Sequence, residues 1–205
     1  MGEVTFSMAE PALDRRLTDH DILVFDIGKV LLSFEPSELK TIFSLSDQLY
    51  SGVFESGLWP LHDTGLIAVP ELARLMCRAA HDVSPSSFLQ VCALLETFYM
   101  HLKPLEASRW LEPLSKMGKK LYYLTNYATP ACEKTIEYFP FFRFFNGGVI
   151  SAVEHMTKPM PCIFRLLCER YGFDPERALF IDDNEENIRT AKAIGFETWL
   201  YRQSN

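Results

Sequence analysis

The sequence predicts an α/β protein with a doubly wound, mostly parallel sheet and one inserted all-helical domain. Three observations support this prediction. Short apolar runs typical of buried strands recur along the chain, helical patterns separate the later runs, and one long helical block interrupts the alternation. Strands that alternate with helices of ten or more residues form parallel sheets, because each helix carries the chain back across the sheet.

Composition places the chain among proteins with a large core and an acidic surface. It has 205 residues, of which 48% are hydrophobic, and a formal charge of −7. This charge argues against a nucleic-acid partner or an anionic membrane surface. No apolar run approaches the roughly 18 residues that span a bilayer. The cysteines are odd in number and include no CxxC pair, so we interpret them as reduced core residues of a cytoplasmic protein.

The first predicted strand, "DILVFD", covers residues 21–26 and follows an N-terminal arm over residues 1–20. The arm has no apolar segment of the kind found in secretory signals. Similar short apolar runs, rich in branched and aromatic residues, predict four later strands at 120–126, 147–151, 178–182 and 196–201. Between them, the phenylalanine-rich stretch 138–148 is expected to pack beneath the sheet, unless part of it faces a partner.

Three helical patterns alternate with these later strands, and each ends at a glycine that is expected to be a left-handed C-terminal cap: Gly118, Gly172 and Gly195. Helix starts carry a second signal, because proline suits the first helical position. We predict that position for Pro130, Pro159 and Pro175.

Between residues 34 and 103 the alternation stops. The stretches 36–63, 69–82 and 84–102 read as amphipathic helices, separated by turn signals such as Asp63-Thr64-Gly65. A helical block directly after the first strand is most simply a cap domain at the carboxyl edge of the sheet. The core would then consist of residues 21–33 and 104–205.

Polar residues gather where the predicted strands end. In open α/β sheets, ligands bind in the crevice beyond the carboxyl ends of the strands. Oxygen ligands suit Mg²⁺, which commonly combines one or two carboxylates with substrate phosphate, and an aspartate can also attack phosphorus. These residues therefore predict a site for Mg²⁺ and a phosphate: Asp26, Thr125, Asn126, Lys158, Asp182 and Asp183.

In these positions the chain resembles the haloacid dehalogenase-like (HAD) hydrolases, in the subgroup with a helical cap after the first strand. "DIGKVLL" from Asp26, "LTN" at 124–126, "TKP" around Lys158 and "FIDDNEEN" at 180–187 follow the order of that family's four motifs. The matches extend over the chain after residue 20. The resemblance implies a Rossmann-like core and phosphatase chemistry on a small phosphorylated metabolite.

Catalytic roles follow from this resemblance. Asp26 is expected to be the nucleophile that takes the phosphoryl group as an aspartyl-phosphate. Thr125 is expected to hydrogen-bond a phosphate oxygen, and Lys158 to stabilise the negative charge. Substrate binding is assigned to the backbone N–H groups near Ile27 and Asn126.

The metal ligands are also implied by the resemblance. Mg²⁺ would be bound by Asp26, by the carbonyl of Gly28 and by Asp183. Asp182 would bind the ion through a water molecule, or would support the direct ligands without contacting the ion. Asn187 is interpreted as a residue on the face of a helix or one that braces the loop, rather than as a ligand.

Gly28 departs from the family pattern. Most phosphatases of the family carry an aspartate at this position, two residues after the nucleophile, as general acid and base. Active members with glycine there include the bacterial α-D-glucose-1-phosphate phosphatases, whose "DxGNV" start is similar, although Lys29 replaces the asparagine. In the cap, His62 or Asp63 could bind substrate and supply the missing proton. The alternative for His62 is that it is an ordinary exposed histidine with no role in the site.

The leading hypothesis is a Mg²⁺-dependent phosphatase, monomeric or homodimeric, for a small metabolite such as a sugar 1-phosphate. One alternative is a catalytically silent member that binds a ligand or a protein, because Gly28 removes the acid. A second alternative is a haloacid dehalogenase that attacks carbon through Asp26. It is disfavoured because such relatives use no metal, whereas the adjacent acids Asp182 and Asp183 of this chain suggest a metal site.

Overall fold

The computed structural model describes residues 13–203 and contains one five-stranded sheet. Its strands are β1 (Ile22–Phe25), β2 (Lys120–Thr125), β3 (Gly147–Ile150), β4 (Ala178–Asp182) and β5 (Glu197–Leu200). They lie in the order β3-β2-β1-β4-β5, and every neighbouring pair is parallel. The predicted parallel sheet is confirmed, and β1 lies at its centre.

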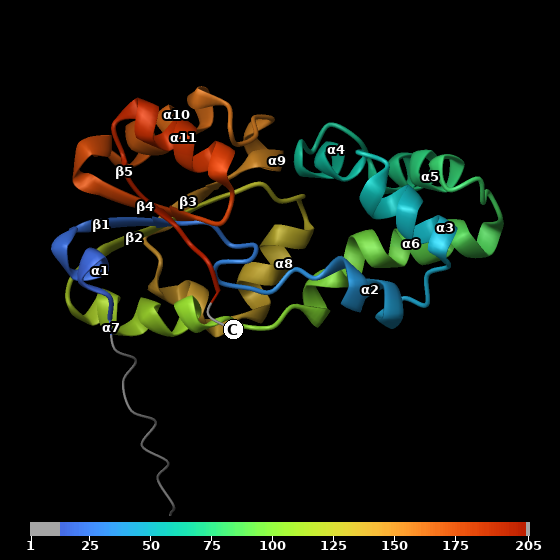
Figure 1. The fold of residues 1–205 in the computed structure, drawn as a ribbon, viewed down its shortest axis with the longest axis horizontal. Helices are drawn as coiled ribbons and strands as arrows, with labels where there is room; N and C mark the ends of the chain where they lie inside the picture. Colours follow the sequence, from blue (N-terminus) through green and yellow to red (C-terminus); the bar gives the residue numbers. More distant parts are fainter. Residues whose placement is uncertain (1–12, 204–205) are drawn as a thin grey trace, which may run out of the picture.

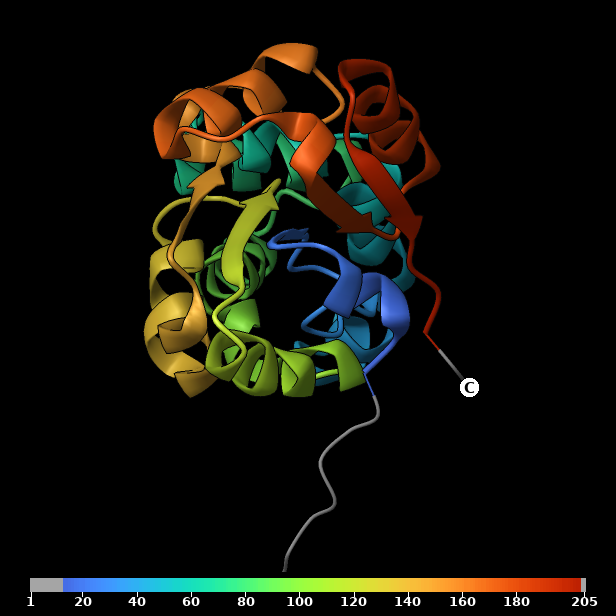
Figure 2. The same ribbon diagram turned by 90° about the vertical axis from the view of Figure 1, so that its left-hand side faces the viewer.

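Helices cover both faces of this sheet (Figures 1 and 2). Helices α10 (Pro161–Tyr171) and α11 (Glu185–Ile194) pack on one face. The opposite face is covered by α1 (Arg15–Asp19), α7 (Leu111–Lys116) and α8 (Ala131–Tyr138). The short helix α9 (Ser151–Glu154) follows β3 directly. Within residues 13–203, no helix is long and apolar enough to cross a membrane.

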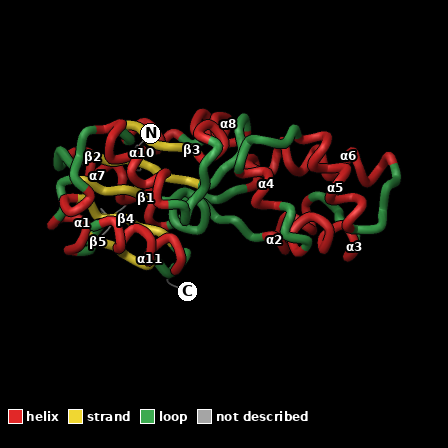
Figure 3. Tube along the Cα trace, turned by 90° about the horizontal axis from the view of Figure 1, so that it is seen from above, coloured by secondary structure: helices red, strands yellow, loops and turns green. Residues whose placement is uncertain are grey.

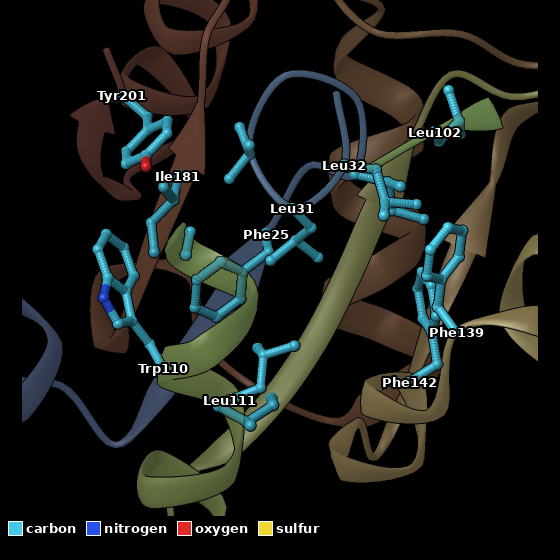
Figure 4. Packing of buried hydrophobic residues seen from close by; sticks show 14 of the residues in the cluster. Phe25, Leu31, Leu32, Leu102, Trp110, Leu111, Phe139, Phe142, Ile181 and Tyr201 are labelled. Carbon is cyan, nitrogen blue, oxygen red and sulfur yellow. The ribbon is translucent and has the colours of Figure 1, made fainter. Parts of the chain in front are cut away.

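Burial on both faces explains the continuous apolar character of β1. Leu23 and Phe25 pack into the core cluster on the α7 side, whereas Ile22 and Val24 pack into the cluster on the α10 side. Figure 4 shows Phe25 within the first of these clusters. The same view includes Phe139 and Phe142, which confirms that the phenylalanine-rich stretch contributes to the core.

Residues 34–103, here called the helical insertion, form helices and turns and contain no strand. The helices are α2 (Pro36–Ile42), α3 (Asp47–Tyr50), α4 (Trp59–Asp63), α5 (Val69–Ala79) and α6 (Pro85–Thr97). They extend to one side of the sheet (Figures 1 and 3). Leu72, Met76 and Leu94 lie in a core cluster that contains residues of the insertion alone, so it packs around its own centre.

Several predicted boundaries are corrected by the structure. The stretch 36–63 is divided by turns and by a π-helical segment at Ser51–Glu55. Pro159 is not a first helical position, because α10 begins at Pro161, and Pro175 opens a short 3₁₀ helix. Pro130 is the residue before α8 rather than its first residue. The three predicted glycine caps are confirmed, with φ of +78° at Gly118, +67° at Gly172 and +116° at Gly195.

Part of the predicted N-terminal arm belongs to the core. Residues 1–12 lie outside the described residues, but α1 covers Arg15–Asp19. Its Leu17 is fully buried in the cluster on the α7 side, and the guanidinium of Arg16 lies 3.7 Å from the ring centroid of Trp199. An apolar anchor and a cation–π contact therefore hold the end of the arm against the sheet.

Candidate active site

Asp26 lies just beyond the carboxyl end of β1, at the base of a compact loop. Its N–H bonds to the Ile181 carbonyl at 2.9 Å and so extends the ladder to β4. The Ile27 N–H donates to Asp26 Oδ1 at 2.7 Å, which orients the carboxylate. In this structure the Ile27 N–H therefore binds the expected nucleophile. The resemblance implies that N–H groups near Ile27 bind the substrate phosphate. The left-handed residue of the bend is Lys29, with φ of 58°, rather than Gly28.

Three carboxylates meet at this edge of the sheet. Asp26, Asp182 and Asp183 each bring an oxygen within 4.8 Å of the others. The Lys158 ammonium lies among them, 2.9 Å from Asp26 Oδ1 and 2.7 Å from Asp182 Oδ2. Lys158 and Asp182 are only 4% and 0% exposed and Asp26 is also buried, whereas Asp183 is only partly buried.

The hydrogen bonds of Asp182 identify it as a positioning residue. Its Oδ2 accepts from Lys158, its Oδ1 accepts from the Asn184 N–H at 2.8 Å, and the Asn187 amide donates to both oxygens. Asp183 differs, because no described residue forms a hydrogen bond or an ion pair with its carboxylate. Asp183 is therefore free to bind a cation directly, whereas Asp182 holds Lys158. Asn187, on α11, therefore braces the Asp182 carboxylate.

Residues at the end of β2 support the same cluster. The Asn126 amide donates to the Lys158 carbonyl at 2.9 Å and accepts from the Lys158 N–H at 2.8 Å, so it clamps the backbone of this lysine. Thr125 is 1% exposed, and its Oγ1 has no hydrogen-bond partner among the described residues. A buried hydroxyl without a partner is costly, and a phosphate oxygen would satisfy it.

Electrostatics at the cluster favour a bound cation. Burial raises the pKa of Asp26 to about 7, against the opposing attraction of Lys158. Burial and the neighbouring Asp182 also raise the pKa of Asp183. Burial lowers the pKa of Lys158, but the Asp182 and Asp26 carboxylates outweigh it and the net shift is upward. The carboxylates of Asp26, Asp63, Asp182 and Asp183 outnumber the two ammonium groups of Lys29 and Lys158 here, so a divalent cation with a preference for oxygen, such as Mg²⁺, fits the excess charge.

The cluster opens into a cavity of about 290 Å³ between the sheet and the helical insertion. The polar part of its lining includes Asp26, Asn126, Lys158 and Asp183 from the carboxyl edge of the sheet and Asp63 from the insertion. Its aromatic and apolar lining residues include Leu32, Phe34, Trp59, Phe98, Leu102 and Tyr127. The cavity therefore offers both charged and apolar surface to a ligand.

Two adjacent residues of α4 have different environments. Asp63 lines this cavity. His62 does not line it, is 4% exposed, and packs against the rings of Trp59 and Phe98 with centroids 5.6 and 6.5 Å away. The alternative of an exposed histidine is wrong, and the cavity that His62 lines is a separate one of about 230 Å³. Its substrate-binding role therefore stays a prediction without support from this geometry.

Ser151 is a residue that the sequence analysis missed. Its Oγ donates to the Asp63 carbonyl at 2.6 Å and accepts from the Tyr127 N–H at 2.9 Å. This buried hydroxyl thus ties the end of α4 to the loop after β2. No local pattern marks Ser151, because its partners lie 88 and 24 residues away along the chain.

Comparison with protein families gives one match that covers most of the chain. Residues 20–195 match haloacid dehalogenase-like hydrolases. A sesquiterpene phosphatase of Aspergillus oryzae is 25% identical over 176 residues, which cover 84% of this chain and 85% of that protein. The phosphoglycolate phosphatase of Escherichia coli is 31% identical over 85 residues, which cover 42% of this chain and 34% of that enzyme.

Solved structures show the same fold. A HAD family enzyme of Bacteroides thetaiotaomicron, crystallised with magnesium and inorganic phosphate, superimposes with a TM-score of 0.68 at 23% identity. The superposition covers 91% of this chain and 96% of that one. At this identity the likeness establishes the fold, with its sheet and its helical insertion.

Proposed function

The chain belongs to the haloacid dehalogenase-like hydrolase family, and from this premise we propose that it is a Mg²⁺-dependent phosphatase. The reaction would proceed through an aspartyl-phosphate at Asp26. The observation that carries the proposal is the grouping of the buried Asp26 and Lys158 with the partly buried Asp183 at the carboxyl end of the central strand. It combines a nucleophile, a fixed positive charge and an open metal ligand within one cavity.

Asp26, Asp183 and the carbonyl of Gly28 are the residues that would hold Mg²⁺. When bound, the ion would neutralise charge on the transferring phosphoryl group. Lys158, held by Asp182 and Asn126, would balance the remaining charge on the phosphoryl oxygens. Thr125 would donate its unpaired hydroxyl to one of these oxygens. Its position at the end of β2, next to the central strand, supports this role.

The cavity lining supports a substrate whose alcohol presents an apolar face. Phe34, Trp59 and Phe98 line the same cavity as the charged residues, and their ring centroids lie 5.3 to 5.9 Å apart. Such a surface suits a prenyl or aryl alcohol, and one relative is named as a sesquiterpene phosphatase. A sugar 1-phosphate, suggested by the sequence, has one apolar ring face and remains the second arm of the substrate test.

The experiment is phosphate release from p-nitrophenyl phosphate, with and without Mg²⁺, by the wild-type enzyme and by Asp26→Asn. Release that requires both Mg²⁺ and Asp26 supports the proposal. Its absence on this ester and on a panel of prenyl, aryl and sugar phosphates favours the silent alternative. Halide release from 2-haloacids without Mg²⁺ favours the dehalogenase alternative. Relative kcat/KM values for farnesyl phosphate and glucose 1-phosphate then decide the substrate class.

A further inference from the structure

The position where related phosphatases carry their acid is vacant in this chain. A Cβ built on Gly28 meets no atom within 4 Å, so the cavity is open at this point and no neighbouring side chain fills it. If the proposed phosphatase activity holds, the leaving oxygen needs a proton from another residue. The titratable residues around the cavity are Asp26, Lys29, Asp63, Tyr127, Lys158 and Asp183.

Most of these groups already have another role. Asp26 and Asp183 serve the nucleophilic and metal functions, and Lys158 forms ion pairs with Asp26 and Asp182. The Tyr127 hydroxyl is hydrogen-bonded to Thr135 Oγ1 at 2.9 Å, and Lys29 is exposed at the mouth of the cavity. The carboxylate of Asp63 has no hydrogen bond or ion pair with any residue between 13 and 203. Asp63 is therefore the one lining acid without an assignment within the described part of the chain.

The turn that carries Asp63 is held firmly against the core. The Ser151 hydroxyl binds the Asp63 carbonyl at 2.6 Å, and His155 Nδ1 lies 3.0 Å from the Thr64 carbonyl. Gly65 has φ of +67°, and a Cβ there would lie 2.3 Å from the Ala152 carbonyl oxygen, so the turn is in close contact with α9. Although Asp63 belongs to the helical insertion, its position relative to Asp26 is set by these core contacts.

The surroundings of Asp63 suit a proton donor at neutral pH. Burial and, to a smaller extent, the negative charge of Asp26 raise its pKa to about 7, against the opposing effect of Lys158. A carboxyl group with a pKa near the working pH can both give and take a proton, as general acid–base catalysis requires. The other charged side chains that line this cavity are Asp26, Lys29, Lys158 and Asp183.

We propose that Asp63 is the general acid and base of the phosphoryl transfer, supplied by the insertion in place of the acid absent at Gly28. An Asp26 oxygen forms a bond to phosphorus while the bond from phosphorus to the leaving oxygen breaks, and the Asp63 carboxyl gives its proton to that oxygen. The resulting Asp63 carboxylate then takes a proton from the water that attacks the phosphorus of phospho-Asp26. Inorganic phosphate and the free Asp26 carboxylate are released, and Asp63 is protonated again.

The test compares leaving groups. Asp63→Asn keeps the backbone carbonyl that binds Ser151 and removes only the proton donor. For phenyl phosphate, a poor leaving group, kcat/KM should fall by about 10²–10⁴-fold, whereas for p-nitrophenyl phosphate it should fall less than about tenfold, because kcat/KM reports only the steps up to the formation of phospho-Asp26. Loss of the base should slow the hydrolysis of phospho-Asp26 equally for both esters, so the phosphorylated enzyme should accumulate. Glu55→Gln, at an exposed acid of the same insertion, is the matched control and should change neither rate.

A rescue variant separates catalysis from structure. Gly28→Asp in the Asp63→Asn background places an acid in the open space at Gly28 and should restore hydrolysis of phenyl phosphate selectively. Equal losses of kcat/KM for both esters, or an unchanged kcat/KM for phenyl phosphate, would overturn the role of Asp63. Either result leaves the phosphatase proposal intact, because that proposal depends on Mg²⁺- and Asp26-dependent turnover of p-nitrophenyl phosphate.

Discussion

The carboxyl edge of the sheet and the helical insertion contribute to the same cavity in different ways. At the sheet edge, Asp26 and Asp183 follow buried parallel strands, so topology alone brings them together. In the insertion, Asp63 and His62 are neighbours on one short helix, yet one lines the cavity and the other is buried among aromatic rings. Strand ends predict chemistry well, whereas a residue on a helix of an inserted domain depends on packing that the sequence does not display.

The largest expected effect tests the sheet edge. Asp26→Asn should lower kcat by at least about 10⁴-fold, because only a carboxylate can form the acyl-phosphate. The fold should be retained or stabilised, since burial raises the pKa of Asp26 and its charge is unfavourable there. Steady-state kinetics and thermal unfolding measure both. Asp21→Asn, which changes an exposed acid beside the opposite end of β1, is the control. A loss of kcat as large in Asp21→Asn would contradict the assignment of the chemistry to the carboxyl edge of the sheet.

Asp182 should show a large effect on stability. Asp182→Ala removes one of the two carboxylates that pair with the buried Lys158 ammonium and leaves the Asn187 amide without its acceptor, so the free energy of unfolding should fall by at most about 3–5 kcal/mol. For activity, in contrast, the sequence predicts a smaller loss in Asp182→Ala than in Asp183→Ala, because Asp182 is expected to act behind the direct metal ligands. Denaturant unfolding measures the change. The added substitution Lys158→Met should recover part of the loss, and a stability equal to wild type in Asp182→Ala would refute its positioning role.

Asp183 should instead govern the cation. Asp183→Ala should lower Mg²⁺ affinity by at least about tenfold, because the variant removes the carboxylate that has no protein partner. Calorimetric titration of the protein with Mg²⁺ measures this without any substrate. Glu186→Ala, which removes an exposed acid from the same loop-to-helix segment, should leave the affinity unchanged. Equal affinities in wild type and Asp183→Ala would place the metal elsewhere.

His62 should contribute to acid sensitivity rather than to substrate binding. Burial lowers the pKa of His62 from 6.5 to about 4. Between these two pH values, the imidazole binds a proton in the unfolded chain but not in the folded chain. The free energy of unfolding therefore has its full value above pH 6.5 and decreases, by at most about 3 kcal/mol, as the pH falls toward 4. His62→Leu should flatten the pH dependence of unfolding in this range. An unchanged pH profile with a raised KM would instead make His62 a substrate contact.

The sequence was sufficient for the sheet and for the residues at its edge, because alternating strands and helices admit few arrangements. It was insufficient where contacts join distant segments. Ser151 binds Asp63 across 88 residues, and Asn126 clamps Lys158 across 32 residues. The helix boundary at Pro159 was wrong because proline also suits turns, and two residues of such a turn separate Lys158 from α10. The environments of Asp63 and His62 likewise depend on how α4 packs.

Covalent phosphorylation is the most direct test of the division between the two regions. Wild-type enzyme is mixed with an aryl phosphate and Mg²⁺, quenched with acid within the first turnovers, digested, and analysed by mass spectrometry. The phosphoryl group should be found on the peptide that contains Asp26, and it should also form there in Asp63→Asn when the leaving group is p-nitrophenolate. Phosphorylation of another residue, or turnover without any phosphorylated peptide, would contradict the assignment of the chemistry to the sheet edge.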